Sequence, residues 1–378
     1  MISIFDSIPA NLYHTIYIYV LCGLSLLISF YYLSSEDGNS ITSGSNNTNQ
    51  ILAIAFGVFI IIYIGLRPVS GIFVDMLMYD HVYNNIYGSG ESFDTRGEWV
   101  FYLIGDTCKS LGLSDRLYFL VLAIIYFGGM IATCWRLMKD NLFVALLFCF
   151  ISFSCFSYGV NGLRNGIACS IIMFAITFLA KGKNKLLFAL FLMLTALNIH
   201  RSTLLPSVCA IAALFFVKEP KYAFYFWVSS IFISLVAGNF VTELFVGLGF
   251  DDRMEQYANL NEEDAGVTPD QLSGFRIDFI LYSIIPIIMA WYITIKRNFK
   301  DQMYNIIATT YILANAFWVM VIRSEQSNRF AYLSWFLYPI VIAYPLLRMN
   351  IWDNQDRKTA VILLLYSGFT FFMNFIYG

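Results

Sequence analysis

His200 and Arg201 stand side by side in the stretch TALNIHRSTLLPS (residues 195–207), between two strongly apolar runs. Imidazole can take up a proton near neutral pH, which suits it to general base catalysis. Guanidinium grips a phosphate or carboxylate with two parallel hydrogen bonds. The pair therefore combines a group that could activate a hydroxyl with a group that could hold an anion. A structural hydrogen-bonding role at a helix end is the alternative for His200.

Other arginines also lie at the edges of apolar runs. Arg164 lies in SYGVNGLRNGIACS, which contains no acidic residue, so we expect it to contact a substrate. Arg276 and Arg329 precede apolar runs, and local pairing with Asp278 or Glu325 is their alternative. Arg67 and Arg323 end apolar runs, and simple anchoring of these runs is their alternative.

Acidic and phenolic side chains gather between residues 67 and 116. Asp75 and Tyr79 are four residues apart and would share one face of a helix, where carboxylate and phenol suit sugar hydroxyls. An interfacial helix with aromatic anchors is the alternative. Glu98 opens a further amphipathic stretch. The sequence has no phosphate-binding Gly-x-x-x-x-Gly-Lys loop and no metal-ligand spacing, so we expect neither a cofactor nor a metal ion.

The elements that must position these residues are membrane helices. Of 378 residues, 59% are hydrophobic and 13% are charged, whereas soluble proteins carry roughly a quarter charged residues. We predict an all-α, polytopic integral membrane protein with a single transmembrane domain over 1–378. Its twelve predicted spans, at about 20 apolar residues each, are 12–33, 51–66, 117–135, 141–157, 162–180, 186–199, 203–217, 222–240, 277–295, 303–322, 330–348 and 359–377.

Lysine and arginine are distributed differently between the two sides of these spans. The short connections at 136–141, 181–185, 218–221, 296–300 and 348–358 are rich in lysine, which predicts that they are cytoplasmic. Both termini and the loops 67–116 and 241–276 then lie outside. The outer side holds one lysine but nine arginines, several of them at helix N-termini, where peptide dipoles also favour an anion. This preference for arginine predicts a phosphate-binding face.

Five motifs, taken in order, resemble those of the Wzy-type bacterial polysaccharide polymerases, in particular the EpsG-like branch. They are YIGLRPVSGIFVDMLMY (63–79), GEWVFYLIG (97–105), YGVNGLRNGIACSI (158–171), NIHRSTLLPS (198–207) and NRFAYLSWFLYP (328–339). The chain departs from the family pattern at Phe73 and Val74, where glycine is frequent, and at Asn165, where glutamine is frequent.

The resemblance implies a membrane glycosyltransferase, GT-C-like, in the bacterial inner membrane, with its active site facing the periplasm or cell exterior. Its partners would be membrane lipids and donor and acceptor glycans on undecaprenyl pyrophosphate, with a chain-length regulator and a flippase in the same pathway, and no nucleic acid. The growing glycan would pass to a sugar hydroxyl of the lipid-linked repeat unit without a metal ion. The product would be an O-antigen of lipopolysaccharide, a capsule or an exopolysaccharide.

On this hypothesis His200 is the general base, with Asp75 or Glu98 as the alternative. The acceptor sugar would be bound by Asp75, Tyr79, Asn161 and Asn165. The pyrophosphate would be bound by Arg164, Arg201, Arg276, Arg329, Arg67 and Arg323. Two other functions stay open: an O-antigen ligase, which uses the same donor, and a flippase or exporter of lipid-linked glycans.

Overall fold

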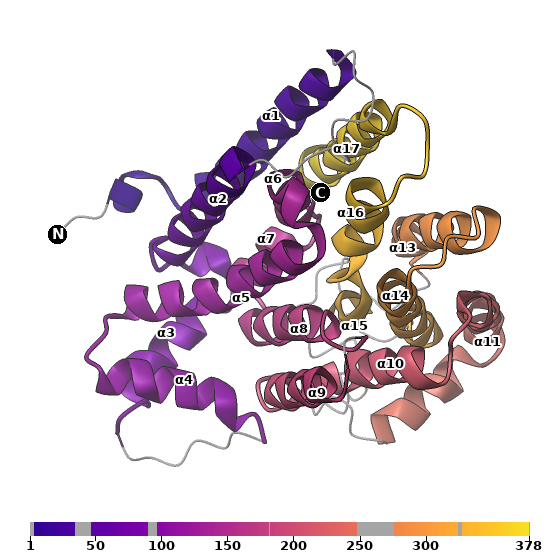
Figure 1. Ribbon diagram of the computed structural model, residues 1–378. Helices are drawn as coiled ribbons and strands as arrows, with labels where there is room; N and C mark the ends of the chain where they lie inside the picture. Colours follow the sequence, from indigo (N-terminus) through magenta and orange to yellow (C-terminus); the bar gives the residue numbers. More distant parts are fainter. Residues whose placement is uncertain are drawn as a thin grey trace. The chain divides into compact units, whose positions relative to one another are not determined.

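A computed structural model describes residues 4–34, 47–89, 97–180, 182–247, 276–323 and 327–377. Throughout these ranges the regular structure is helical, which confirms the predicted all-α class (Figure 1). The α-helices are α1 (Leu12–Ser34), α2 (Asn47–Gly65), α3 (Met76–Asn85), α4 (Trp99–Ser110), α5 (Asp115–Met138), α6 (Leu142–Phe150), α7 (Cys155–Val160), α8 (Leu163–Ile176), α9 (Lys183–Leu197), α10 (Leu204–Phe215), α11 (Pro220–Gly247), α13 (Ile277–Trp291), α14 (Gln302–Met320), α15 (Ser327–Trp335), α16 (Tyr338–Arg348) and α17 (Gln355–Phe372).

Eight helical stretches of the described ranges are long and apolar enough to cross a membrane. The protein is therefore a polytopic membrane protein, but the predicted count of twelve spans is not confirmed. The middle of the chain accounts for much of the difference. Residues Asp115–Phe150 form one nearly continuous apolar stretch, and Leu163–Ile176 and Arg201–Phe215 are shorter than a full span.

The predicted span 141–157 is broken into α6 and α7, and the break is supported by side chains. Tyr17 donates a hydrogen bond to the carbonyl of Phe150 at 2.7 Å, and Thr370 donates to the carbonyl of Ile151 at 2.8 Å. Non-helical backbone is tolerated at membrane depth only where protein groups satisfy its polar atoms. Here α1 and α17 provide those groups, so hydropathy alone could not locate the break.

The chain divides into two compact units. Unit 1 contains Met1–Thr177, Phe188–His200 and Ala343–Gly378, and unit 2 contains Phe178–Leu187 and Arg201–Ile342. In unit 1, α1 packs on α17, α2 packs on α5, and α5 packs on α8. Gly129 of α5 permits the last approach, since a Cβ there would lie 2.1 Å from the Ser170 hydroxyl. Small residues of this kind let membrane helices pack closely.

Unit 2 is built around α14, on which α10, α11 and α15 pack. The buried amide of Asn315 accepts a hydrogen bond from Trp227 at 2.8 Å and donates one to Ser334 at 3.0 Å. Trp335 donates to Ser283 at 2.7 Å, which joins α15 to α13. Interhelical hydrogen bonds of this kind hold membrane helices in register, because lipid offers polar atoms no other partner.

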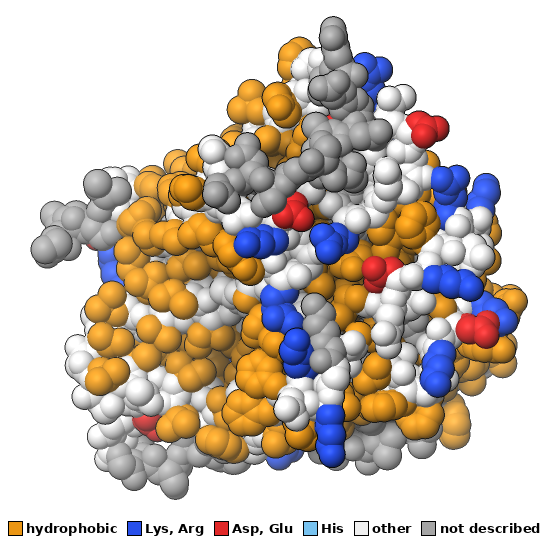
Figure 2. All heavy atoms as spheres, viewed as in Figure 1, with side chains coloured by type: hydrophobic (Ala, Val, Ile, Leu, Met, Phe, Trp, Pro, Cys, Tyr) orange, Lys and Arg blue, Asp and Glu red, His pale blue; other side chains and the backbone are white. Residues whose placement is uncertain are grey.

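Hydrophobic side chains cover broad areas of the face drawn in Figure 2. Helices of both units expose large hydrophobic side chains. Phe30 of α1 is 74% exposed, and Val236 of α11 is 88% exposed. Such apolar exposure indicates contact with lipid, because a soluble surface of this composition would aggregate. Of the predicted loops, residues 35–46, 90–96 and 248–275 lie outside the described residues.

Candidate functional site

Four side chains that are far apart in the sequence meet in unit 1. Tyr79 lies on α3, Glu98 immediately precedes α4, Arg164 lies in the first turn of α8, and His200 follows the end of α9. All four were named from the sequence, and in the fold they are joined by hydrogen bonds. We call these four residues the Tyr79–His200 network.

Glu98 is the centre of the network. One carboxylate oxygen, Oε2, accepts a hydrogen bond from Nη1 of Arg164 at 2.7 Å. The other, Oε1, lies 2.6 Å from Nδ1 of His200. Glu98 is 8% exposed, and burial makes an unpaired carboxylate costly. The guanidinium therefore favours the ionised form of Glu98, which can only accept hydrogen bonds.

This carboxylate decides the tautomer of His200. Because an ionised carboxylate has no proton to donate, the 2.6 Å contact places the proton on Nδ1. The lone pair of a neutral imidazole is then on Nε2, and any imidazolium that forms is stabilised by the negative charge. The same division of roles, with a carboxylate orienting a basic histidine, operates in hydrolytic triads.

Arg164 is held in place from two sides. Its Nε donates to the hydroxyl of Tyr79 at 3.3 Å, a longer contact than the ion pair to Glu98. Gly162, which immediately precedes α8, adopts the left-handed conformation, with φ +53°. Gly166 packs so closely on α7 that a Cβ would lie 2.5 Å from the carbonyl of Tyr158. These glycines let the backbone deliver Arg164 at the helix N-terminus.

A backbone hydrogen bond positions Glu98 beside His200. The N–H of Val100, two residues after Glu98, donates to the carbonyl of Asn198 at 3.1 Å, two residues before His200. Phe101 packs against Tyr79 with ring centroids 5.6 Å apart. The start of α4 is thus hydrogen-bonded to the end of α9 and packed on α3. These contacts hold the carboxylate of Glu98 between Arg164 and His200.

Three further predicted sugar-binding residues lie near the network in sequence. Asp75 is half-buried at the start of α3, and its side chain makes no capping hydrogen bond. Asn161 accepts the N–H of Gly162 through its side chain at 3.0 Å. Asn165 is buried, and its Oδ1 accepts from the thiol of Cys169 at 3.2 Å. The two amides therefore stabilise the start of α8 as observed, and sugar binding by any of the three stays a prediction.

Arg67 is enclosed by protein. It is 1% exposed and donates to the carbonyls of Ile64 at 2.7 Å and Val160 at 3.2 Å. The rings of Phe73 and Phe119 flank its guanidinium, with centroids 5.1 and 5.4 Å from the central carbon. These carbonyls are at the C-terminal ends of α2 and α7, where a cation suits the helix dipole. The geometry matches the anchoring alternative for this residue.

The other predicted arginines belong to unit 2. Arg201 precedes α10, Arg276 precedes α13, Arg323 follows α14, and Arg329 lies in the first turns of α15. Arg276 pairs with Asp278, with its Nη2 2.7 Å from Oδ2, as the local-pairing alternative expects. Arg201, Arg276 and Arg323 lie at the ends of α10, α13 and α14 that are remote from the α10–α11 and α13–α14 connections. Arg67 and Arg164 thus belong to unit 1 and the other four to unit 2, and pyrophosphate binding by these six arginines stays a prediction.

The sequence did not indicate that Glu98 contacts both Arg164 and His200. Glu98 was assigned as an alternative base, whereas its two oxygens are already engaged by Arg164 and His200. No local spacing could have shown either pair, because the partners are far apart in the chain. Within the described ranges, no three His, Cys, Asp or Glu side chains gather as metal ligands would.

Comparison with known proteins identifies a family for this chain. No curated protein and no solved structure matches the chain. Residues 50–378 match the EpsG family, and this stretch contains all five sequence motifs and every residue of the Tyr79–His200 network. EpsG-like proteins are membrane proteins of the polysaccharide polymerase type. The chain belongs to the EpsG family and is a membrane protein of exopolysaccharide biosynthesis.

Proposed function

We propose that this protein is a polysaccharide polymerase that transfers a growing glycan from undecaprenyl pyrophosphate to a sugar hydroxyl of a lipid-linked repeat unit. The reaction takes place on the outer side of the bacterial cytoplasmic membrane. The observation that carries the proposal is the Tyr79–His200 network, in which a buried carboxylate joins a histidine to an arginine. A base and an anion-binding group at one place are what this transfer needs.

The network divides the reaction between its members. The acceptor hydroxyl gives its proton to Nε2 of His200 while its oxygen forms the new bond to the anomeric carbon of the donor. The bond between that carbon and the pyrophosphate oxygen breaks, and the electron pair leaves with the pyrophosphate. Glu98 holds His200 in the basic tautomer and stabilises the imidazolium.

Arg164 meets the negative charge that develops on the leaving group. Of its nitrogens, Nε and Nη1 bond to Tyr79 and Glu98, while Nη2 makes no hydrogen bond with any described residue. The N-terminus of α8 adds its dipole at the same place. Pyrophosphate binding by Arg201, Arg276, Arg323 and Arg329 of unit 2 is a separate part of the proposal. The transfer proceeds without a metal ion.

A reconstituted assay tests this proposal. Purified protein in detergent receives synthetic undecaprenyl-pyrophosphate-linked repeat units, with a chelator present, and products are separated by size. We expect a ladder of products, and we expect His200→Ala to slow its formation about 10²–10⁴-fold, the usual contribution of a general base. Absence of any ladder without added Mg²⁺, followed by its appearance when Mg²⁺ is added, would exclude the metal-free mechanism.

The same assay separates the two alternative functions. A ligase would join the donor glycan to a lipid A-core acceptor and leave the repeat units unextended. A flippase or exporter would make no glycosidic bond in detergent. Extension of repeat units without a membrane gradient therefore supports the polymerase alone.

A further inference from the structure

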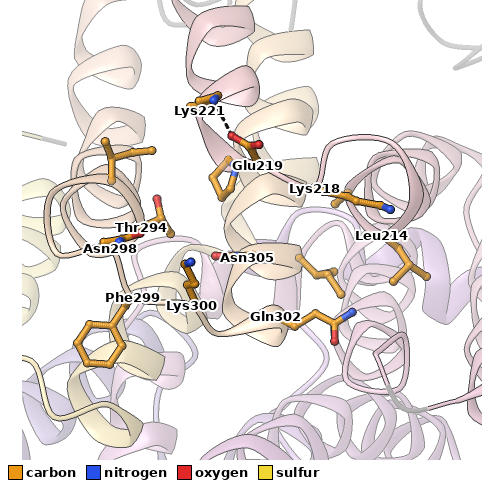
Figure 3. Close-up of a pocket in the computed structure, with 14 residues that line it drawn as sticks. Leu214, Lys218, Glu219, Lys221, Thr294, Asn298, Phe299, Lys300, Gln302 and Asn305 are labelled. Carbon is orange, nitrogen blue, oxygen red and sulfur yellow. Dashed lines mark ion pairs between the residues drawn. The ribbon is translucent and has the colours of Figure 1, made fainter.

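Unit 2 contains a cavity at the end opposite to its arginines. The cavity has a volume of about 850 Å³ and lies where α10 ends, α11 and α14 begin, and α13 passes into a π-helical segment (Tyr292–Lys296) (Figure 3). This volume is in the range of cavities that bind small molecules, roughly 300–1,000 Å³. A π-helical turn at such a place is frequent in functional sites.

The charge of the lining is positive. Lys218, Lys221 and Lys300 line the cavity together with one acid, Glu219. Glu219 is already engaged by Lys221, with Nζ 2.6 Å from Oε2. Lys218 and Lys300 have no ion pair with any described residue. Figure 3 shows Lys300 and Asn305 together in the middle of the lining, while Lys218 stands at its rim. Two lysines are thus available for an anion.

Neutral polar groups complete the lining. Thr294, Asn298 and Gln302 contribute a hydroxyl and two amides. The Oδ1 atom of Asn305 is buried and accepts no hydrogen bond from a described residue. A buried acceptor without a partner is destabilising unless a ligand or water donates to it. A ligand hydroxyl would supply that donor, so the cavity suits a molecule that carries both an anion and hydroxyl groups.

We propose that this cavity binds a phosphate ester with a hydroxyl-bearing group, such as a glycerol phosphate. The phosphate would lie against Lys218 and Lys300, near the starts of α11 and α14, where helix dipoles favour an anion. A hydroxyl of the ester would donate to Asn305. The lysine-rich connections place this cavity on the side predicted to be cytoplasmic. None of the residues that line it belongs to the Tyr79–His200 network, so the proposal does not rest on the polymerase reaction.

Calorimetric titration of the full-length protein in a neutral detergent tests the proposal. The phosphate probes are glycerol 3-phosphate and dihexanoyl phosphatidylglycerol, and the reference compounds are glycerol and dihexanoyl phosphatidylcholine. The variant Lys218→Gln/Lys300→Gln removes two exposed charges from the cavity. The matched control, Lys183→Gln/Lys185→Gln, removes two exposed charges from the first turn of α9, outside the cavity.

We expect at least one phosphate probe to bind, and we expect the cavity variant to weaken it about thirtyfold, at roughly 1 kcal/mol for each lysine. The control pair should change affinity less than threefold. Asn305→Leu should weaken a hydroxyl-bearing probe while leaving the two lysines in place. Binding of both probes identifies the phosphate ester itself as the ligand, and binding of the lipid alone identifies a membrane headgroup.

Two results would overturn the proposal. The first is the absence of heat with both phosphate probes. The second is an equal loss of affinity in the cavity and control pairs, which would mean that surface lysines attract anions without a site. Both lysines of the cavity variant are exposed, so we expect it to fold, and an unchanged elution volume checks this.

Discussion

Glu98→Gln isolates the electrostatic role of the network with almost no change of shape. The amide keeps the size of the carboxylate but removes its charge. Its Oε1 can still accept one hydrogen bond, while its NH₂ group can only donate and faces either Arg164 or His200, both of which are donors. The substitution therefore either breaks one of the two short contacts or, if the NH₂ group donates to Nδ1 of His200, moves the imidazole proton to Nε2, and in both cases it leaves the imidazolium without a counter-charge.

The size of the effect follows from the geometry. Atoms 2.6 Å apart place the charge centres of the carboxylate and imidazolium roughly 4 Å apart. At an effective dielectric constant of about 20, this attraction is about 4 kcal/mol, and the side chains are 10% and 18% exposed, which limits solvent screening. If most of this is realised only when His200 takes up the proton, the turnover number falls about 10³-fold.

The assay is extension of lipid-linked repeat units at saturating donor, with product counted per enzyme. Glu98→Gln, His200→Ala and the double variant form a cycle. Because Glu98 acts through His200, the double variant should be no slower than His200→Ala alone. The orienting role would be refuted if the rate losses of the two single variants multiplied in the double variant. It would also be refuted if the turnover number of Glu98→Gln were within fivefold of the wild-type value. Unchanged thermal unfolding excludes misfolding as the cause.

Three further predictions concern single positions. Arg164→Lys keeps the charge but cannot bond Tyr79, Glu98 and a phosphate together, so activity in the extension assay should fall about 100-fold or more; near-normal product length would make Arg164 structural. Tyr79→Phe removes one 3.3 Å hydrogen bond of about 1 kcal/mol, so initial rates should fall only about fivefold. Arg67→Met leaves two helix-end carbonyls unpaired, and we expect a lower unfolding temperature in detergent, whereas the exposed-side-chain variant Arg357→Met should leave it unchanged.

The sequence predicted the class of protein and the members of the site. Composition and apolar run length indicate a membrane protein because the transfer of side chains into lipid depends on each residue separately. The absence of a nearby acid in the chain around Arg164 marked it as unusual, and its functional interest could be predicted for that reason. Hydropathy failed at the broken stretch α6–α7, because its polar backbone atoms are satisfied by Tyr17 and Thr370, which come from distant helices.

Only the tertiary structure decided which of these groups meet. Local spacing rules reach about four residues along a helix, whereas Glu98 is 66 residues from Arg164 and 102 from His200. Their contact depends on how α4, α8 and α9 pack, which is a property of the whole of unit 1. The residue types were therefore readable from the sequence, but the role of Glu98 as the link between base and arginine was decided by helix packing.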